Sequence, residues 1–201
     1  MAKDGAIQVS VVVPVYDGAE TLRDVITELS ALHDPQRTPQ GRGFQVSEVL
    51  LVWDRGSKGS ADAMRQLDKE FDFVRTIWLS RNFGQHAATL AGMTSSNGEW
   101  VVTLDEDGQQ DPSFIGAMLD RAFDTGSQLI YADPTNGAPH SGLRNSASRF
   151  TKWFFLKVLS ESSFTEFNSY RLMHGEIART VAAYTGSGVY LDVALSWVVA
   201  Q

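Results

Sequence analysis

The chain has 201 residues, of which 43% are hydrophobic and 20% are charged, so it can bury one substantial core. Its 17 Lys and Arg against 24 Asp and Glu leave a net charge of -7, which argues against a nucleic-acid-binding protein. The chain has no cysteine, which excludes disulfides, thiolate metal sites and cysteine nucleophiles. No apolar run approaches the roughly 18 residues that cross a bilayer, so we expect a cytoplasmic or peripheral protein.

Short apolar runs of strand character alternate with longer segments of helical spacing, which predicts an α/β fold. The predicted strands are 8–13, 46–53, 73–79, 100–104 and 128–132. The predicted helices are 19–32, 60–71, 85–94 and a segment that follows Pro112. We expect a mostly parallel sheet flanked by helices, with a ligand site where the carboxyl ends of the strands meet.

The second half of the chain is less regular. Residues 133–141 have loop composition, and 143–159 reads as a helix with three consecutive aromatic residues and several basic ones. This helix either packs in the core or docks on an anionic membrane surface, and the sequence alone does not choose. The apolar stretch 189–201 has no capping residue at its end, so we expect the natural polypeptide to continue beyond it.

The clearest chemical signal is LDEDGQQDP, in which Asp105, Asp107 and Gln109 alternate directly after an apolar strand. Alternate side chains of an extended segment point the same way, so these three oxygen donors can converge on Mg²⁺ or Mn²⁺. A nucleotide diphosphate is the usual partner for the open positions of such an ion. The alternative is a solvated acidic turn, with Asp111 capping the next helix.

Two further turns follow predicted strands. PVYDGAE presents Tyr16 and exposed backbone groups against which a nucleobase can pack, or it is an ordinary strand-to-helix turn. VWDRGSKGSAD offers Asp54 as an acceptor for a base N–H or a ribose hydroxyl, and its glycines allow close backbone approach. Alternatively, this turn caps the next helix through Ser60.

Together these segments resemble the family 2 glycosyltransferases of the GT-A fold, especially the polyprenyl-phosphate branch that includes dolichyl-phosphate mannose synthase. The similarity runs through VSVVVPVYDGAETL, VLLVWDRGSKGSAD, LSRNFGQHAATLAGM, WVVTLDEDGQQDP and, more weakly, NSYRLMHGEI. The resemblance implies one GT-A domain over 1–201. Its nucleotide-sugar-binding half would be 1–132, and 133–201 would face the acceptor and the membrane.

The resemblance also implies roles for individual residues. The positions matched to nucleotide-sugar binding are Pro14, Val15, Tyr16, Glu20, Asp54, Arg81, Asp105, Arg144 and Arg171. The implied metal ligands are Asp107, Gln109 and Asp105, of which Asp105 also lies near the ribose or sugar. For Arg171, a surface salt bridge is an equal alternative.

Some positions depart from the family pattern. Trp53, Gly56 and Lys58 stand within the segment where the family usually has Asp-Asp-x-Ser-x-Asp. One acceptor carboxylate and one capping Asp are therefore missing. These departures fall on the base and ribose side, so they leave open the nucleotide and whether activity is impaired.

The function implied is a metal-dependent inverting transferase that moves a sugar from a nucleotide-diphosphate sugar to a polyprenyl phosphate at the inner face of the cell membrane. Such an acceptor is already anionic, whereas a glycan or other hydroxyl acceptor needs a base. Asp192 is the late acid in a suitable setting, and it is either that catalytic base or a helix-surface carboxylate. Two hypotheses without sugar transfer are a nucleotide-sugar-binding protein with impaired turnover and a scaffold that interacts through its aromatic helix.

Overall fold

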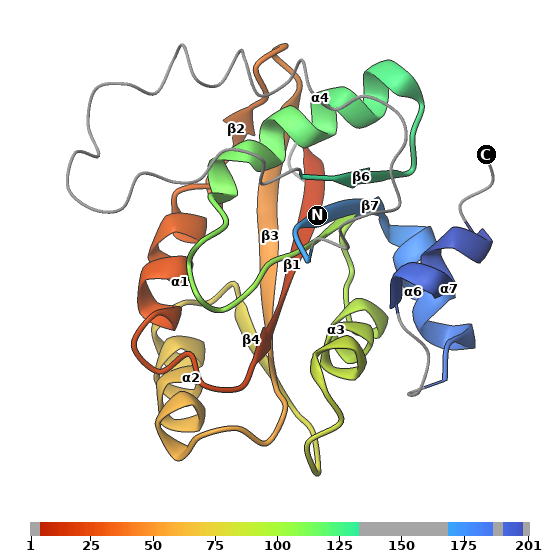
Figure 1. Ribbon diagram of the computed structural model, residues 1–201. Coiled ribbons are helices and arrows are strands. Elements are labelled where there is room, and N and C mark those ends of the chain that lie inside the picture. Colours follow the sequence, from red (N-terminus) through yellow and green to blue (C-terminus); the bar gives the residue numbers. More distant parts are fainter. Residues whose placement is uncertain (1–4, 133–168, 187–190, 199–201) are drawn as a thin grey trace.

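The computed structural model describes residues 5–132, 169–186 and 191–198, which form a sheet with helices on both faces (Figure 1). The strands are β1 (Ile7–Val15), β2 (Gln36–Arg37), β3 (Gly43–Trp53), β4 (Val74–Trp78), β5 (Trp100–Thr103), β6 (Leu129–Tyr131) and β7 (Arg171–His174). The helices are α1 (Leu22–Ser30), α2 (Lys58–Glu70), α3 (Gln85–Thr94), α4 (Ile115–Thr125), α6 (Gly175–Tyr184) and α7 (Leu191–Val198), and a 3-10 turn at Pro112–Phe114 leads into α4.

The prediction of a mostly parallel sheet is confirmed. β1 lies at the centre and pairs in parallel with β3 and β5, and β4 adds a further parallel strand beside β3. β7 is antiparallel to both β5 and β6, so β6 runs in the same direction as β5. The short strands β2 and β7 were not predicted, because neither contains an apolar run longer than two residues.

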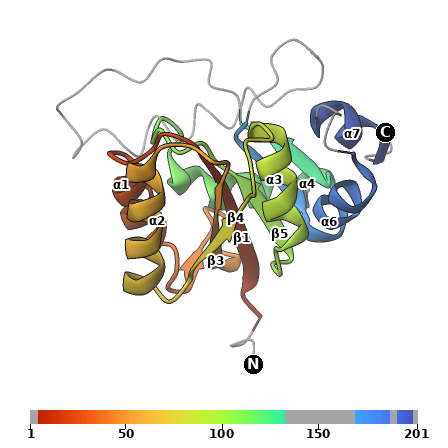
Figure 2. The same cartoon turned by 90° about the horizontal axis from the view of Figure 1, so that it is seen from below.

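The two faces of the sheet carry separate apolar layers. Along β1, Val9, Val11 and Val13 pack towards α1, α2 and α4, whereas Val12 packs towards α3, α6 and α7. Figure 2 shows α1 and α2 on one side of the sheet and α3 and α6 on the other. A central parallel strand is covered on both faces, which explains why β1 reads as a continuous apolar run.

Local signals position the helix ends. The N-cap of α2 is Ser57, whose side chain accepts a hydrogen bond from the backbone N–H of Ser60, so the prediction that Ser60 is the cap is wrong by three residues. Asp111 accepts from the N–H of Ser113 and caps the turn before α4, as the alternative interpretation of the acidic segment predicted. Gly126 ends α4 in the left-handed conformation, with φ of 68°.

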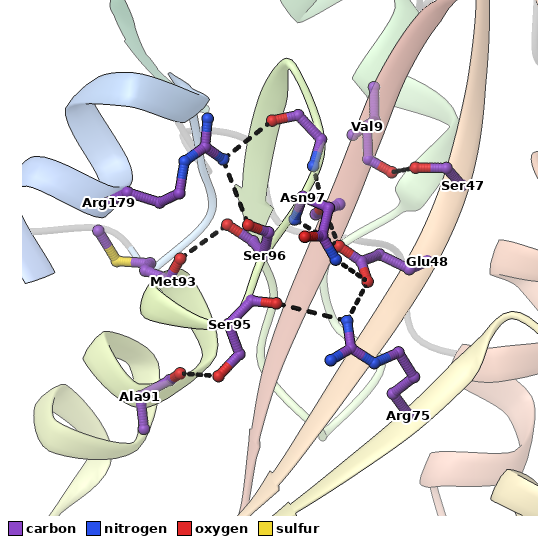
Figure 3. A network of polar contacts seen from close by, with 12 residues as sticks. Val9, Ser47, Glu48, Arg75, Ala91, Met93, Ser95, Ser96, Asn97 and Arg179 are labelled. Atoms are coloured by element: carbon purple, nitrogen blue, oxygen red, sulfur yellow. Dashed lines mark hydrogen bonds and ion pairs between the residues drawn. The ribbon is translucent and has the colours of Figure 1, made fainter. Parts of the chain in front are cut away.

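A polar network lies at the amino-terminal end of the parallel strands (Figure 3). Its centre is Glu48 of β3, which accepts hydrogen bonds from the hydroxyl of Ser10, the N–H of Asn97 and the guanidinium of Arg75 at 2.7, 2.7 and 2.5 Å. Burial raises the pKa of Glu48, but these hydrogen bonds together lower it below its ordinary value. An irregularity in the β1 and β3 register at Ser47 precedes this carboxylate.

The aromatic helix predicted for 143–159, the loop 133–141 and the apolar end of the chain after Val198 lie outside the described residues. Their roles, like the division into two halves, stay predictions. Within the three described stretches, none of the helices has both the length and the apolar character needed to span a bilayer.

Candidate active site

A cleft of about 450 Å³ opens at the carboxyl ends of β1, β3 and β5. Its lining comes from the ends of these strands and from the loop between β4 and α3. The lining residues are Pro14, Val15, Tyr16, Asp54, Asn82, Gly84, Gln85, Asp105, Glu106 and Asp107. The turns predicted to meet at this edge of the sheet therefore do so, since each supplies at least one residue.

The turn after β1 packs closely against the turn after β3. The backbone N–H of Asp54 donates to Val15 O at 2.9 Å, and the N–H of Ser57 donates to Tyr16 O at 2.8 Å. A Cβ on Gly56 would lie only 1.7 Å from Tyr16 O, so no larger residue fits unless the turn moves. Gly56, a departure from the family pattern, is thus required by the packing of this chain. The Tyr16 side chain itself is 53% exposed.

Asp54 shapes the loop that precedes α3. Its carboxylate is 4% exposed and accepts hydrogen bonds from the backbone N–H groups of Phe83 at 2.7 Å and Gly84 at 2.8 Å. One bond reaches each oxygen, and a carboxylate oxygen can accept a second. Asp54 can therefore hold this loop and still accept a hydrogen bond from a ligand in the cleft.

Asp105 is oriented by neutral donors from three segments. The side-chain amide of Gln85 donates to Oδ1 at 2.6 Å, and the amide of Gln110 and the hydroxyl of Ser169 both donate to Oδ2. Gln110 Oε1 also accepts from the N–H of Asp105 at 2.9 Å. These bonds fix the side chain of Asp105 at the edge of the cleft. Next to Ser169, burial raises the pKa of Tyr170, and the charge of Asp111 acts in the same direction.

Glu106 connects the acidic loop to the turn after β1. Its two carboxylate oxygens accept from the backbone N–H groups of Tyr16 at 3.0 Å and Asp17 at 2.9 Å. The hydroxyl of Thr21 donates to the backbone oxygen of Glu106 at 2.6 Å. The base-binding turn and the acidic loop that the sequence predicted as separate elements are thus hydrogen-bonded to each other.

The three predicted metal ligands do not all face the cleft. Asp105 and Asp107 line it, whereas Gln109 is exposed and is not among the lining residues. Gln109 instead donates its backbone N–H to Asp107 Oδ1 at 3.0 Å. In the part of the chain that the structure describes, no group of three His, Asp or Glu side chains is arranged to hold a metal ion. Two carboxylates at one cleft still match the oxygen donors that Mg²⁺ and Mn²⁺ prefer.

The other residues predicted near the donor lie around the cleft or beyond it. Glu20 is exposed on the turn before α1, outside the lining. Arg81 is also exposed, and its guanidinium lies 4.6 Å from the ring centroid of Phe83. Its neighbour Asn82 lines the cleft.

The predicted site residues in the last third of the chain differ in where they lie. Arg171 lies in β7 beside Thr103 of β5 and is 4% exposed, so it is not on the surface, where the salt-bridge alternative located it. Asp192 lies in α7, which packs against α6, but its side chain is outside the described set. Arg144 also lies outside the described residues.

Sequence reasoning assigned no individual role to five polar residues that line the cleft or orient its acids. The sequence held weak signals for three of them: Asn82 is in the segment RNFG, Glu106 lies between the two paired acids, and Ser169 is in the segment NSYRLM. The five are Asn82, Gln85, Glu106, Gln110 and Ser169.

Solved structures share this fold. A mannosyltransferase from Pyrobaculum calidifontis, solved with GDP-Man and Mn²⁺, matches 94% of this chain and 50% of its own with a TM-score of 0.64 and 15% identity. TarS 1-349 of S. aureus, solved with UDP, matches 96% of this chain and 55% of its own with a TM-score of 0.61 and 14% identity. The GT-A fold prediction is confirmed.

The chain belongs to glycosyl transferase family 2, whose model matches residues 10–183. Undecaprenyl-phosphate 4-deoxy-4-formamido-L-arabinose transferase of Salmonella paratyphi A is 35% identical over 143 residues, which are 71% of this chain and 41% of that protein. The enzyme of the same name from Salmonella newport is 34% identical over the same lengths. The chain thus spans about two fifths of the length of the curated relatives it matches.

Proposed function

We propose that the chain carries the donor site of a glycosyltransferase that moves a sugar from a nucleotide-diphosphate sugar to a polyprenyl phosphate at the membrane surface. The observation that carries this proposal is the meeting of Tyr16, Asp54, Asp105 and Asp107 at one cleft. Membership of family 2 and relatives named for undecaprenyl phosphate support it.

The donor base is proposed to bind beside the turn after β1. The exposed Tyr16 ring offers an aromatic face for stacking. Asp54 offers acceptor capacity for a base N–H or a ribose hydroxyl, and its two hydrogen bonds to the loop before α3 hold it in place. These two groups come from adjacent parallel strands, so the base and the ribose would lie across the strand ends.

The diphosphate is proposed to lie towards the acidic loop. Asp107 and Asp105 would hold Mg²⁺ or Mn²⁺ there, and the bound ion would act as a Lewis acid that stabilises negative charge on the leaving phosphate. The neutral donors on Asp105 keep its carboxylate oriented towards the cleft. A cation also explains how a chain with a net charge of -7 binds an anionic donor.

A lipid phosphate is the proposed acceptor, because it is an anionic nucleophile at neutral pH and needs no general base. In the described part of the cleft lining, the acids Asp54 and Asp105 accept hydrogen bonds from other groups of the chain. Neither carboxylate is therefore our candidate for the general base that a hydroxyl acceptor would need. A lipid-linked acceptor would locate the reaction at the membrane surface, and we propose its cytoplasmic face.

Thermal unfolding with UDP, GDP and dTDP, each with and without Mn²⁺, tests the donor site. A nucleotide at 100 times its Kd should stabilise the fold by about 2.7 kcal/mol, and only with the metal present. Transfer to a short polyprenyl phosphate is then compared with transfer to a sugar hydroxyl. A metal-dependent shift followed by lipid transfer supports the proposal. No shift with any nucleotide, or binding without transfer, overturns it.

A further inference from the structure

The carboxylate of Glu106 spans two loops that approach the cleft from different strands. It belongs to the loop after β5 and accepts from two consecutive backbone N–H groups in the turn after β1, those of Tyr16 and Asp17. Each oxygen takes one of them, at 3.0 and 2.9 Å. Charge-assisted bonds of this kind are stronger than bonds between neutral groups.

The packing around this contact leaves little room for other arrangements. A Cβ on Gly18 would lie 2.4 Å from Glu106 Oε2, so the carboxylate lies directly against the turn. On the other side, a Cβ on Gly56 would overlap Tyr16 O. The turn is therefore held between Glu106 and the loop after β3. The hydroxyl of Thr21 adds a third bond, to the backbone of Glu106.

The carboxylate of Glu106 has different hydrogen-bond partners from those of Asp105 and Asp107. A third carboxylate beside Asp105 and Asp107 adds repulsion at the cleft, unless donors from the chain engage it. Its two oxygens accept from N–H groups of the turn, whereas Asp107 accepts a bond from its own loop through Oδ1. All three acids line the cleft, but both oxygens of Glu106 are engaged by the backbone of the turn.

We propose that Glu106 is a positioning residue that fixes the spacing between the base-binding turn at Tyr16 and the Asp105 and Asp107 pair. A nucleotide diphosphate would reach from one to the other, so its affinity depends on that spacing. This consequence rests on the proposed function, whereas the contact between the two loops does not.

Three variants of the whole chain test the proposal. Glu106→Ala removes both acceptors, and Glu106→Gln keeps one acceptor oxygen. The matched control is Glu70→Gln, because Glu70 also accepts one bond on each oxygen, from Arg23, on the exposed surface of α1 and α2. The measurements are hydrogen exchange at the amides of Tyr16 and Asp17, the Kd of UDP and GDP with Mn²⁺, and KM and kcat for the nucleotide sugar.

Glu106→Ala is expected to speed exchange at both amides and to raise Kd and KM roughly tenfold, the equivalent of about one lost hydrogen bond, with kcat within about threefold. Glu106→Gln should fall between Glu106→Ala and the parent protein, and Glu70→Gln should match the parent. Unchanged exchange in Glu106→Ala overturns the contact itself. Faster exchange with unchanged Kd and KM overturns its role in donor binding. If the parent binds no nucleotide, the proposed function fails, while exchange still decides whether Glu106 holds the turn.

Discussion

Acidic side chains at opposite ends of the sheet have different hydrogen-bond and ion-pair partners. At the amino-terminal end, Glu48 is 7% exposed and is paired with the guanidinium of Arg75 at 2.5 Å. At the carboxyl end, Asp105, Glu106 and Asp107 accept only from amides, a hydroxyl and backbone N–H groups, and no Lys or Arg within the described ranges forms an ion pair with them.

The difference separates an acid that stabilises the fold from acids that we propose bind a ligand. The charge of Glu48 is paired with Arg75 within the chain, so this interaction contributes to the stability of the folded state. Asp105 and Asp107 are oriented by neutral groups, so their charge remains available to a cation. We therefore expect substitutions at the carboxyl end to lower sugar transfer and substitutions at the amino-terminal end to lower the free energy of unfolding.

The largest effect is expected for Asp107→Asn. The change removes a negative charge from the cleft while it keeps the size of the side chain, so it should lower sugar transfer by roughly 10²–10³-fold. Stability without ligand should stay the same, because Asp107 is exposed. Kinetics with varied Mn²⁺ and a melting curve test this. A large loss of stability would contradict the comparison, and Asp72→Asn at an exposed position serves as the control.

Glu48→Ala should have the opposite profile. It leaves Arg75, Ser10 and the N–H of Asn97 without their acceptor, and we expect a loss of about 2 kcal/mol in the free energy of unfolding. Urea denaturation measures the loss, with Glu70→Ala as an exposed control whose effect should be smaller. The Kd for nucleotide should not change. A weakened Kd in the folded variant would show that the two ends are coupled.

A smaller effect is expected for Gln110→Ala, which removes the amide that orients Asp105 from two sides. Transfer should fall about tenfold, equivalent to about 1.4 kcal/mol of barrier. Gln45→Ala is a matched control, because the amide of Gln45 bonds only the side chain of Gln8 among the described residues, at 2.7 Å. Equal activity of the two variants would show that Asp105 needs no such orientation.

The smallest effect is the pH dependence that Glu48 contributes. Its folded pKa is lowered from the ordinary value of 4.5, so its stabilisation is present above pH 4.5 and is lost as the pH falls through the folded pKa. The stability difference between the parent and Glu48→Gln should therefore be full at pH 6 and shrink below pH 4.5. Urea denaturation across this range tests it, and a constant difference would contradict it.

The sequence predicted most of the sheet because its central strands are long apolar runs that must be buried. It missed β7, where only Leu172 and Met173 lie between two polar ends. This strand is recognisable only from its place between β5 and β6, which depends on tertiary contacts.

The site was predicted in part for a similar reason. The rule that ligands bind at the carboxyl ends of parallel strands correctly brought Tyr16, Asp54 and Asp105 to one cleft. The alternation of side chains expected after Leu104 requires an extended segment, but the chain turns there, and Gly108 has a φ of 71°. The turn lets Glu106 reach the neighbouring loop and leaves Gln109 outside the lining.

The place of β7 has a consequence for how the protein matures. β6 is bonded only to β7 in the described sheet, and the hydroxyl that orients Asp105 comes from Ser169, 64 residues later in the chain. During synthesis, Asp105 and Asp107 therefore leave the ribosome well before Ser169, which helps to orient Asp105. A nascent chain released after β6 would carry every lining residue of the cleft, but β7 would be missing and Asp105 would lack the hydroxyl of Ser169.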